Sequence, residues 1–223
     1  MKSTTKLNDH HQREAAFTRT DLLFVGVAVL LLVATTIKLI TKKRFATQRT
    51  QCAQNLKTVG LGHRIWAKDS EDAFPVNYST NREGTKELIG MGVTYRHFFA
   101  LSNELAGNLK VLVCPSDSKR AAATNWSQLA NTNLSYFVGV DAAETLPNSP
   151  LIGDRNILAR FPPTGGLLEL SLTNQVWWGT NLHRGVGNIA LSDGSVQQVD
   201  KTGLWQLIQS AVKSWPTNRL EFP

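Results

Sequence analysis

The pattern of hydrophobic and polar positions changes sharply near residue 40. Residues 22–37 carry no ionisable side chain, and Lys38 is followed by two more apolar residues, so nineteen residues form one apolar stretch. As a helix this stretch is roughly 28 Å long, which matches the hydrocarbon core of a bilayer. A buried core helix is the alternative, but such a helix is rarely apolar on every side. Polar residues 41–44 follow in place of a small-residue cleavage site, so the pattern predicts an uncleaved membrane anchor.

Beyond residue 44 the pattern stays helical, but only one side remains apolar. Small and apolar residues recur at spacings of three and four as far as Trp66, and no proline occurs between Phe17 and Asp69. We therefore predict one helix over residues 17–68, with its first half in lipid and its second half amphipathic. The polar residues 69–72 end it.

The remaining pattern predicts a mixed α+β domain with mainly antiparallel strands. Helical spacing marks residues 95–105 and 204–212, and short apolar runs predict strands at 109–114, 135–140 and 151–153. Alternating residues on both sides of Asp193-Gly194 predict a hairpin, and Asp-Gly favours a tight turn of the primed type. The expected fold is α+β: a long N-terminal helix packed on a small sheet.

The distribution of charge argues against nucleic-acid binding. The net charge is +7, and residues 1–44 carry +5 of it on both sides of the apolar stretch, where cations meet lipid headgroups. The cations on the two sides are too evenly matched for charge counting to give an orientation. We expect membrane lipid, and no nucleic acid, as a partner.

The two cysteines, Cys52 and Cys114, bear on the compartment. In an oxidising compartment they could form one disulfide, although two buried free thiols would have the same sequence. We favour the disulfide, which would place the C-terminal domain outside the cytoplasm.

Candidate catalytic and metal-binding residues are few. His183, Asp154 and Asp193, with Ser192 or Ser195 as nucleophile, would be a hydrolase set, but no Gly-x-Ser-x-Gly segment occurs. The same three residues are acceptable metal ligands, yet no tight ligand cluster is evident, so we expect no metal, no cofactor and no enzyme. We expect His183 to hydrogen-bond the hairpin backbone or a carboxylate.

Two smaller expectations concern surface and turn residues. We expect Asp154 to be a turn residue or a partner of Arg155 or Arg160. The tryptophans could line a glycan-binding face, although aromatic residues of a small domain are more often core. They are Trp177, Trp178, Trp205 and Trp215.

Several short elements together resemble the type IV pilin-like superfamily, specifically pseudopilin-type proteins with a prepilin cleavage and methylation segment. The resemblance is carried by Ala16 and Phe17-Thr18 before the apolar helix, Cys52-Ala53-Gln54-Asn55-Leu56-Lys57, Phe74-Pro75, Cys114-Pro115-Ser116-Asp117, and His183 followed by nine residues and Asp193-Gly194, with Asn188 between them. These elements run from residue 16 to about residue 199. The family has Gly before the Phe, and this chain has Ala.

The resemblance implies a division of the chain and a function. Residues 1–16 would be a leader, 17–44 the transmembrane half of the helix, and 45–223 an extracytoplasmic pilin-like domain that includes the second half. A prepilin peptidase would cut between Ala16 and Phe17. Asp21 stands where the family has a Glu that pairs with a neighbouring subunit's terminal amine; the alternative is that Asp21 is the interfacial end of an uncleaved anchor.

The resemblance also implies where the protein lies and with what it assembles. It would be a single-pass inner-membrane protein, a non-enzymatic subunit of a type II secretion or type IV pilus-like system. It would assemble through its N-terminal helix with other pilin-like subunits. The competing interpretations are a membrane-tethered extracytoplasmic binding module, for which polysaccharide is one ligand, and a tethered hydrolase.

Overall fold

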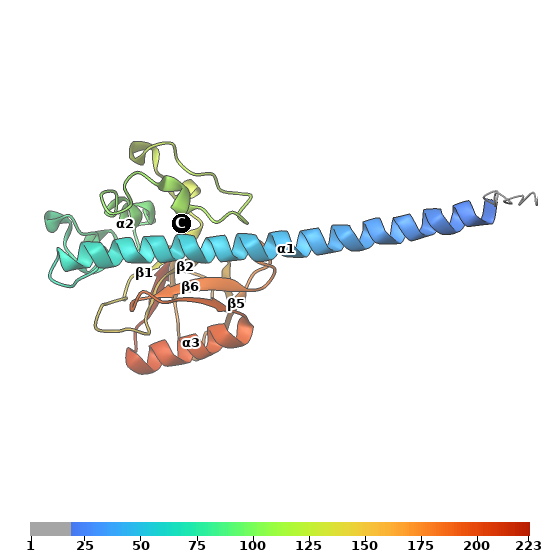
Figure 1. The fold of residues 1–223 in the computed structure, drawn as a ribbon. Coiled ribbons are helices and arrows are strands. Elements are labelled where there is room, and N and C mark those ends of the chain that lie inside the picture. Colours follow the sequence, from blue (N-terminus) through green and yellow to red (C-terminus); the bar gives the residue numbers. More distant parts are fainter. Residues whose placement is uncertain (1–18) are drawn as a thin grey trace, which may run out of the picture. The chain divides into compact units, whose positions relative to one another are not determined.

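The computed structural model describes residues 19–223, and these divide between Lys43 and Arg44 into two compact units. A single helix, α1 (Arg19–Lys68, 50 residues), begins in the first unit and ends in the second. The predicted long helix is therefore confirmed over these residues (Figure 1).

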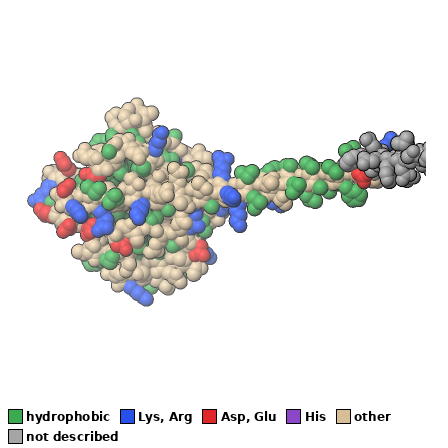
Figure 2. Space-filling view, in the orientation of Figure 1, with side chains coloured by type: hydrophobic (Ala, Val, Ile, Leu, Met, Phe, Trp, Pro, Cys, Tyr) green, Lys and Arg blue, Asp and Glu red, His purple; other side chains and the backbone are tan. Residues whose placement is uncertain are grey.

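The first unit consists of the apolar part of α1. Its large hydrophobic side chains are exposed on all sides, from Leu22 at 70% and Phe24 at 76% to Ile40 at 66%. Figure 2 shows these side chains along the visible face of the segment. The helix is long and apolar enough to cross a membrane, and none of its most apolar window is buried.

In the second unit α1 buries one side. Cys52, Leu56, Val59 and His63 recur at spacings of three and four and are fully buried. This is the spacing that places side chains on one face of a helix. The amphipathic half predicted from the sequence is confirmed.

The second unit is built around a six-stranded sheet in which every neighbouring pair is antiparallel. The strand order is β4-β8-β1-β2-β6-β7, and β3 and β5 form a separate two-stranded sheet. The strands are β1 (Tyr136–Gly139), β2 (Pro150–Asp154), β3 (Ile157–Ala159), β4 (Leu167–Glu169), β5 (Val176–Trp178), β6 (Gly187–Leu191), β7 (Val196–Val199) and β8 (Arg219–Glu221). The α+β prediction is confirmed.

The central strands are buried on both faces because a helix covers each face (Figure 1). Tyr136 and Ala190 pack with α1 in one hydrophobic cluster. Their neighbours Phe137 and Ile189 point the other way, into a second cluster with α3 (Lys201–Ser214). Successive side chains of a strand point to opposite faces, so the two clusters lie on opposite sides of one sheet.

Short helical turns fill the segment between α1 and the sheet. They are η1 (Pro75–Asn77), η2 (Thr80–Arg82), η3 (Lys86–Leu88), α2 (Tyr95–Phe99), η4 (Leu109–Leu112), η5 (Trp126–Gln128) and η6 (Asn131–Asn133). The strand predicted at 109–114 is wrong, because η4 occupies it. An apolar run of this length buries its side chains equally well as a short helix or a strand, so periodicity does not separate the two. The helix predicted over 95–105 is confirmed only as far as Phe99.

The predicted hairpin is confirmed, but its turn is of another type. Strands β6 and β7 pair in antiparallel register, and the Gly194 N–H donates to the Leu191 carbonyl at 2.9 Å. Gly194 has a φ of +83°, whereas Asp193 is not among the residues of positive φ. A primed Asp-Gly turn requires positive φ at both residues. The hairpin instead uses a three-residue loop that ends in a left-handed glycine.

Candidate functional site

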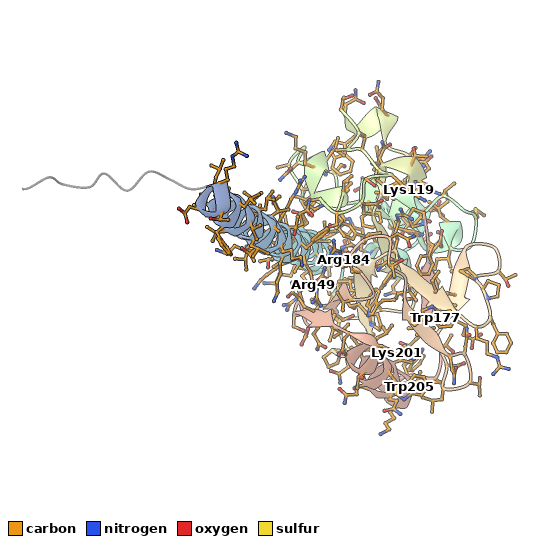
Figure 3. The ribbon with its side chains drawn as sticks, turned by 90° about the vertical axis from the view of Figure 1, so that its right-hand side faces the viewer. Arg49, Lys119, Trp177, Arg184, Lys201 and Trp205 are labelled. Atoms are coloured by element: carbon orange, nitrogen blue, oxygen red, sulfur yellow. The ribbon has the colours of Figure 1, made fainter. Side chains whose placement is uncertain are left out.

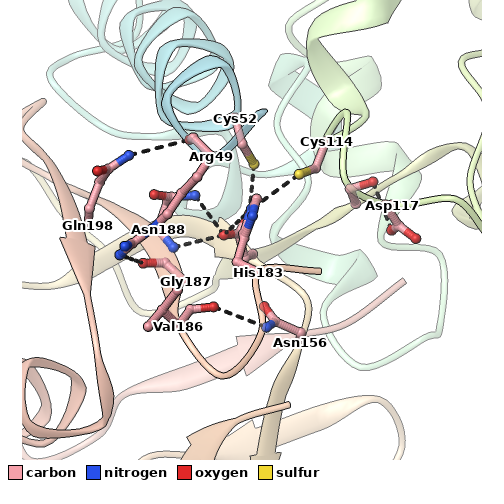
Figure 4. A network of polar contacts seen from close by, with 12 residues as sticks. Arg49, Cys52, Cys114, Asp117, Asn156, His183, Val186, Gly187, Asn188 and Gln198 are labelled. Carbon is pink, nitrogen blue, oxygen red and sulfur yellow. Dashed lines mark hydrogen bonds and ion pairs between the residues drawn. The ribbon is translucent and has the colours of Figure 1, made fainter. Parts of the chain in front are cut away.

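Four side chains with metal-ligating or nucleophilic atoms meet between α1 and the sheet (Figure 4). They are Cys52, Cys114, Asp154 and His183; their ligand atoms all lie within 4.8 Å of one another, and all four residues are buried. They come from four different segments of the second unit. We call them the Cys-Asp-His cluster.

Cys52 reaches the cluster from the buried face of α1. Its Sγ donates to Asp154 Oδ1 at 2.9 Å and lies 3.4 Å from the Tyr136 hydroxyl. Cys52 is fully buried because it continues the apolar stripe that packs on the sheet. The helical spacing of the sequence thus places this thiol at the helix–sheet interface.

Cys114 follows η4, on a loop that Asp117 holds in place. The Asp117 carboxylate accepts from Arg155 Nε at 2.7 Å, from Arg155 Nη2 at 2.9 Å and from the Ser135 hydroxyl at 2.9 Å. The Asp117 N–H in turn donates to the Cys114 carbonyl at 2.8 Å. The Cys-Pro-Ser-Asp element therefore joins Cys114 to the start of β1 and the end of β2.

Asp154 is the last residue of β2 and is fully buried. Its Oδ2 accepts from the backbone N–H and from the Nδ2 of Asn188 on β6, both at 2.8 Å. The expectation that Asp154 is a turn residue or a partner of Arg155 or Arg160 is wrong. Arg155 points to Asp117 instead, because successive side chains of an extended chain leave on opposite sides.

His183 lies on the loop before β6 and contacts two members of the cluster through one atom. Its Nε2 lies 3.2 Å from Asp154 Oδ2 and 3.3 Å from Cys114 Sγ. The prediction that His183 bonds a nearby carboxylate is confirmed. After it, Arg184 has a φ of +57° and Gly185 one of +84°, so the loop turns sharply and aims the imidazole inward.

The contacts among these groups shift their pKa values in opposite directions. Burial alone would lower the pKa of His183, but hydrogen bonds to Asp154 and Cys114 outweigh it and raise that pKa to about 9. A hydrogen bond from Cys52 lowers the pKa of Cys114 to about 6, whereas burial raises the pKa of Cys52 well above its ordinary value. The cluster therefore favours one thiolate beside an imidazolium.

A small cavity borders the cluster on the side of His183. Its volume is about 200 Å³, and it is lined by Phe45, Ala46, Arg49, His183 and Arg184. The Arg184 guanidinium stacks 3.5 Å from the centre of the Phe45 ring. Figure 3 shows Arg49 and Arg184 near each other. His183 therefore lines a space large enough for a small solute.

The Cys-Asp-His cluster lacks the arrangement of a catalytic triad. In a triad the nucleophile and the carboxylate contact different nitrogens of the histidine. Here Cys114 and Asp154 approach the same Nε2. Ser192 is hydrogen-bonded to the Ser149 hydroxyl at 2.7 Å, so its described contacts lie away from His183.

The disulfide expected between Cys52 and Cys114 is not formed in the structure, which has both as buried free thiols. The two cysteines do lie in one cluster, and of the two chemistries that the sequence left open the structure has the free thiols. The Cys52 thiol hydrogen-bonds Asp154, and the Cys114 thiol lies within hydrogen-bond distance of His183. The argument from a disulfide to an extracytoplasmic domain therefore has no support in the structure.

The other residues predicted for function are spread over the chain. Ala16 and Phe17 lie outside the described residues, and Asp21 is in the first turn of α1. Asn188 joins the cluster through Asp154, which sequence reasoning did not anticipate. Asp193 and Gly194 belong to the β6–β7 turn, where Asp193 Oδ1 accepts from the Ser195 N–H at 2.8 Å.

Within the His-x9-Asp-Gly pattern, the two ends therefore serve different purposes. His183 contributes to the buried cluster, and Asp193-Gly194 closes the hairpin that carries β6. Sequence reasoning grouped His183 with Asp193 and Asp154, and only Asp154 is its neighbour. Sequence reasoning did not place Cys52 and Cys114 beside His183 and Asp154. The available signal was that both cysteines lie in the short elements that carry the family resemblance.

Comparisons with protein-family models, with curated proteins and with solved structures found no match for this chain.

Proposed function

We propose that the protein is a membrane-anchored, pilin-like structural subunit that assembles through the apolar part of α1. The observation that carries the proposal is the contrast between the two parts of this helix. Its second part buries an apolar stripe on the sheet, whereas in its first part residues such as Leu22, Phe24 and Leu30 are each at least 70% exposed. An apolar surface of this size needs lipid or other helices to cover it.

The architecture supports the same proposal. One helix supplies both the exposed apolar segment and the apolar stripe that is buried on the antiparallel sheet, as expected of a pilin-like subunit. Asp21, in the first turn of α1, puts a carboxylate at the edge of the apolar segment. The family that the chain resembles has a Glu at this position, which pairs with a neighbouring subunit's terminal amine.

The proposal includes the absence of catalytic turnover. Its support is the geometry of the Cys-Asp-His cluster, in which a carboxylate and a thiol share one nitrogen of His183. The location of the domain outside the cytoplasm is also part of the proposal, and it rests on the family resemblance. Protease protection in sealed membrane vesicles tests that location.

Crosslinking in native membranes tests assembly. Leu30 and Leu32 are both exposed and point to nearly opposite sides of α1. A Leu30→Cys/Leu32→Cys chain treated with a bismaleimide should give a ladder of products beyond the dimer. Leu172, 51% exposed in a loop of the globular unit, supplies the matched control Leu172→Cys, which should stay largely monomeric.

Two results would contradict the proposal. If crosslinking of the Leu30→Cys/Leu32→Cys variant gives only monomer, the protein is a tethered module that does not polymerise. Mass spectrometry of the mature chain should find Phe17 at the N-terminus, and an intact Met1 in cells with an active prepilin peptidase would oppose processing.

A tethered binding module is the second candidate, and one observation favours it. Trp177, Lys201 and Trp205 line a cavity of about 180 Å³ between β5 and α3, and Figure 3 shows them close together. Aromatic faces beside a cation suit a sugar ring with acidic substituents. Binding of acidic polysaccharide that is lost in Trp205→Ala, with no crosslinked ladder, would favour this function.

A further inference from the structure

The geometry points to a metal site: we propose that Cys52, Cys114, Asp154 and His183 bind one zinc-class divalent ion. The site would be structural, joining α1 to the sheet and to the loop after η4. It goes beyond the proposed function and does not depend on it. The sequence alone led us to expect no metal, because His183, Asp154 and Asp193 form no tight ligand cluster in it and the cysteines were assigned to a disulfide.

The spacing of the donor atoms suits a tetrahedral ion. Zinc bonds of about 2.0 Å to nitrogen or oxygen and 2.3 Å to sulfur give tetrahedral edges of about 3.3–3.8 Å. The described contacts are already near these lengths: 2.9 Å from Cys52 Sγ to Asp154 Oδ1 and 3.3 Å from His183 Nε2 to Cys114 Sγ, and His183 Nε2 lies 3.2 Å from the other carboxylate oxygen, Asp154 Oδ2. All the ligand atoms lie within 4.8 Å of one another, so shifts of up to about 1 Å bring them to the edges of a tetrahedron.

The donor set selects the class of ion. Two thiolates and one imidazole are soft or borderline ligands, which favour zinc over magnesium or calcium. Calcium would need six to eight oxygens, and the cluster offers only the oxygens of Asp154. Four protein ligands would also fill the coordination of zinc, which is typical of structural sites rather than catalytic ones.

The surroundings hold the ligands in place. Asn188 donates twice to Asp154 Oδ2, which orients the carboxylate and leaves Oδ1 available to an ion. The Tyr136 hydroxyl, 3.4 Å from Cys52 Sγ, can donate to a thiolate. Two thiolates, a carboxylate and a divalent ion sum to one negative charge. Burial lowers the pKa of Arg49, and the nearby Asp154 carboxylate acts against this lowering. The positive charge of Arg49 therefore offsets the negative charge of the loaded site.

The competing interpretations fit the contacts less well. A disulfide would use the two sulfurs and would leave the convergence of Asp154 and His183 on them without a purpose. A catalytic dyad would need a thiol that substrate can reach, and Cys52 and Cys114 are 0% and 1% exposed. An ion explains why four donors of three kinds, from four segments, lie so close together.

The first experiment measures metal in the full-length chain. We would purify it in a mild detergent under reducing conditions, dialyse it against a chelating resin, add back zinc, and measure zinc by mass spectrometry. The proposal expects about one ion per chain and a higher melting temperature with zinc than without. Cobalt in place of zinc should give the sulfur-to-cobalt charge-transfer band and the intense visible bands of a four-coordinate ion.

Variants assign the ion to the four residues. Cys114→Ser should weaken the sulfur-to-cobalt charge-transfer band, and His183→Gln should lose the intense visible bands of a four-coordinate ion. Each variant should also bind zinc at least tenfold more weakly than the wild type. Asn188→Ala keeps all four ligands and removes only the side-chain bond to Asp154. It should weaken zinc binding about 10–100-fold while the cobalt spectrum stays four-coordinate.

Matched controls separate metal binding from stability. His63→Gln changes another fully buried histidine, and Asn174→Ala another buried asparagine, and neither residue contacts the cluster in the described structure. Both variants should bind zinc as tightly as the wild type does.

Three results would overturn the proposal. One is less than about a tenth of an ion per chain after zinc is added to the reduced wild type, which needs no variant to fold. Another is a Cys52–Cys114 disulfide in protein isolated with its thiols blocked by alkylation. The third is a cobalt spectrum that is unchanged in both Cys114→Ser and His183→Gln.

Discussion

Replacing Asp117 by Asn tests how the Cys-Pro-Ser-Asp element stabilises the domain. The two carboxylate oxygens accept four hydrogen bonds: two from Arg155, one from Ser135 and one from the Lys119 N–H at 3.3 Å. Asn keeps one oxygen and turns an NH₂ group towards the donors of the other. At least one charge-assisted bond of about 1.5–3 kcal/mol is lost, and a nearly buried Arg155 loses its counter-charge.

We therefore expect Asp117→Asn to lower the free energy of unfolding by about 2–4 kcal/mol. For a domain of this size that is a fall in melting temperature of roughly 4–16 °C. Thermal and urea unfolding of the full-length chain in mild detergent, followed by tryptophan fluorescence, measures it. Asp141→Asn is the matched control, since Asp141 also pairs with both ends of an arginine, but Arg219 is 38% exposed against 16% for Arg155.

The pH dependence of the free energy of unfolding tests the same Asp117–Arg155 interaction. Burial acts to raise the pKa of Asp117, but its bonds to Arg155 and Ser135 outweigh burial and lower it. As the pH falls, Asp117 is therefore protonated in the unfolded chain before it is protonated in the folded chain. The stabilisation by Asp117 is complete above the ordinary pKa of an aspartate and is lost as the pH falls below it. The difference between wild type and Asp117→Asn should narrow as the pH falls below about 4. Two results would refute this role of Asp117. One is an equal loss of unfolding free energy in Asp141→Asn and Asp117→Asn, and the other is a difference between wild type and Asp117→Asn that does not change with pH.

Three further predictions concern other parts of the domain. Gly194→Val should lower the free energy of unfolding by about 1–3 kcal/mol, because the φ of Gly194 is +83°. Asp193→Asn should leave it nearly unchanged, since the amide oxygen can still accept from the Ser195 N–H. Equal losses in the two variants would contradict the role of Gly194 in the turn. His63 is fully buried and its pKa is lowered to about 4 by burial, so the wild type should lose up to about 3 kcal/mol as the pH falls from 6.5 to 4, and His63→Gln should not show this loss. Gly187→Ala should destabilise by about 1–3 kcal/mol, because a Cβ there would clash with the buried Trp178 ring, whereas Gly185→Ala, with open space around it, should show backbone strain alone.

Local patterns in the sequence were sufficient for the elements that local physics controls. The apolar stretch and the three-four spacing after it predicted α1, and the Asp193-Gly194 pair between alternating residues predicted the β6–β7 hairpin. These succeed because helix and strand periodicities are properties of neighbouring residues. The strand predicted at 109–114 failed for the same reason, because a short apolar run becomes η4 or a strand according to what it packs against.

The candidate site was decided by tertiary structure. Cys52 and Asp154 are 102 positions apart, and they meet only because α1 packs across the ends of β2 and β6. Whether the two thiols have Asp154 and His183 as neighbours depends on which other segments the fold brings to them. Sequence spacing predicts which residues share a face of one element, but it does not predict which faces meet. The packing of the helix on the sheet turned four scattered residues into one buried cluster.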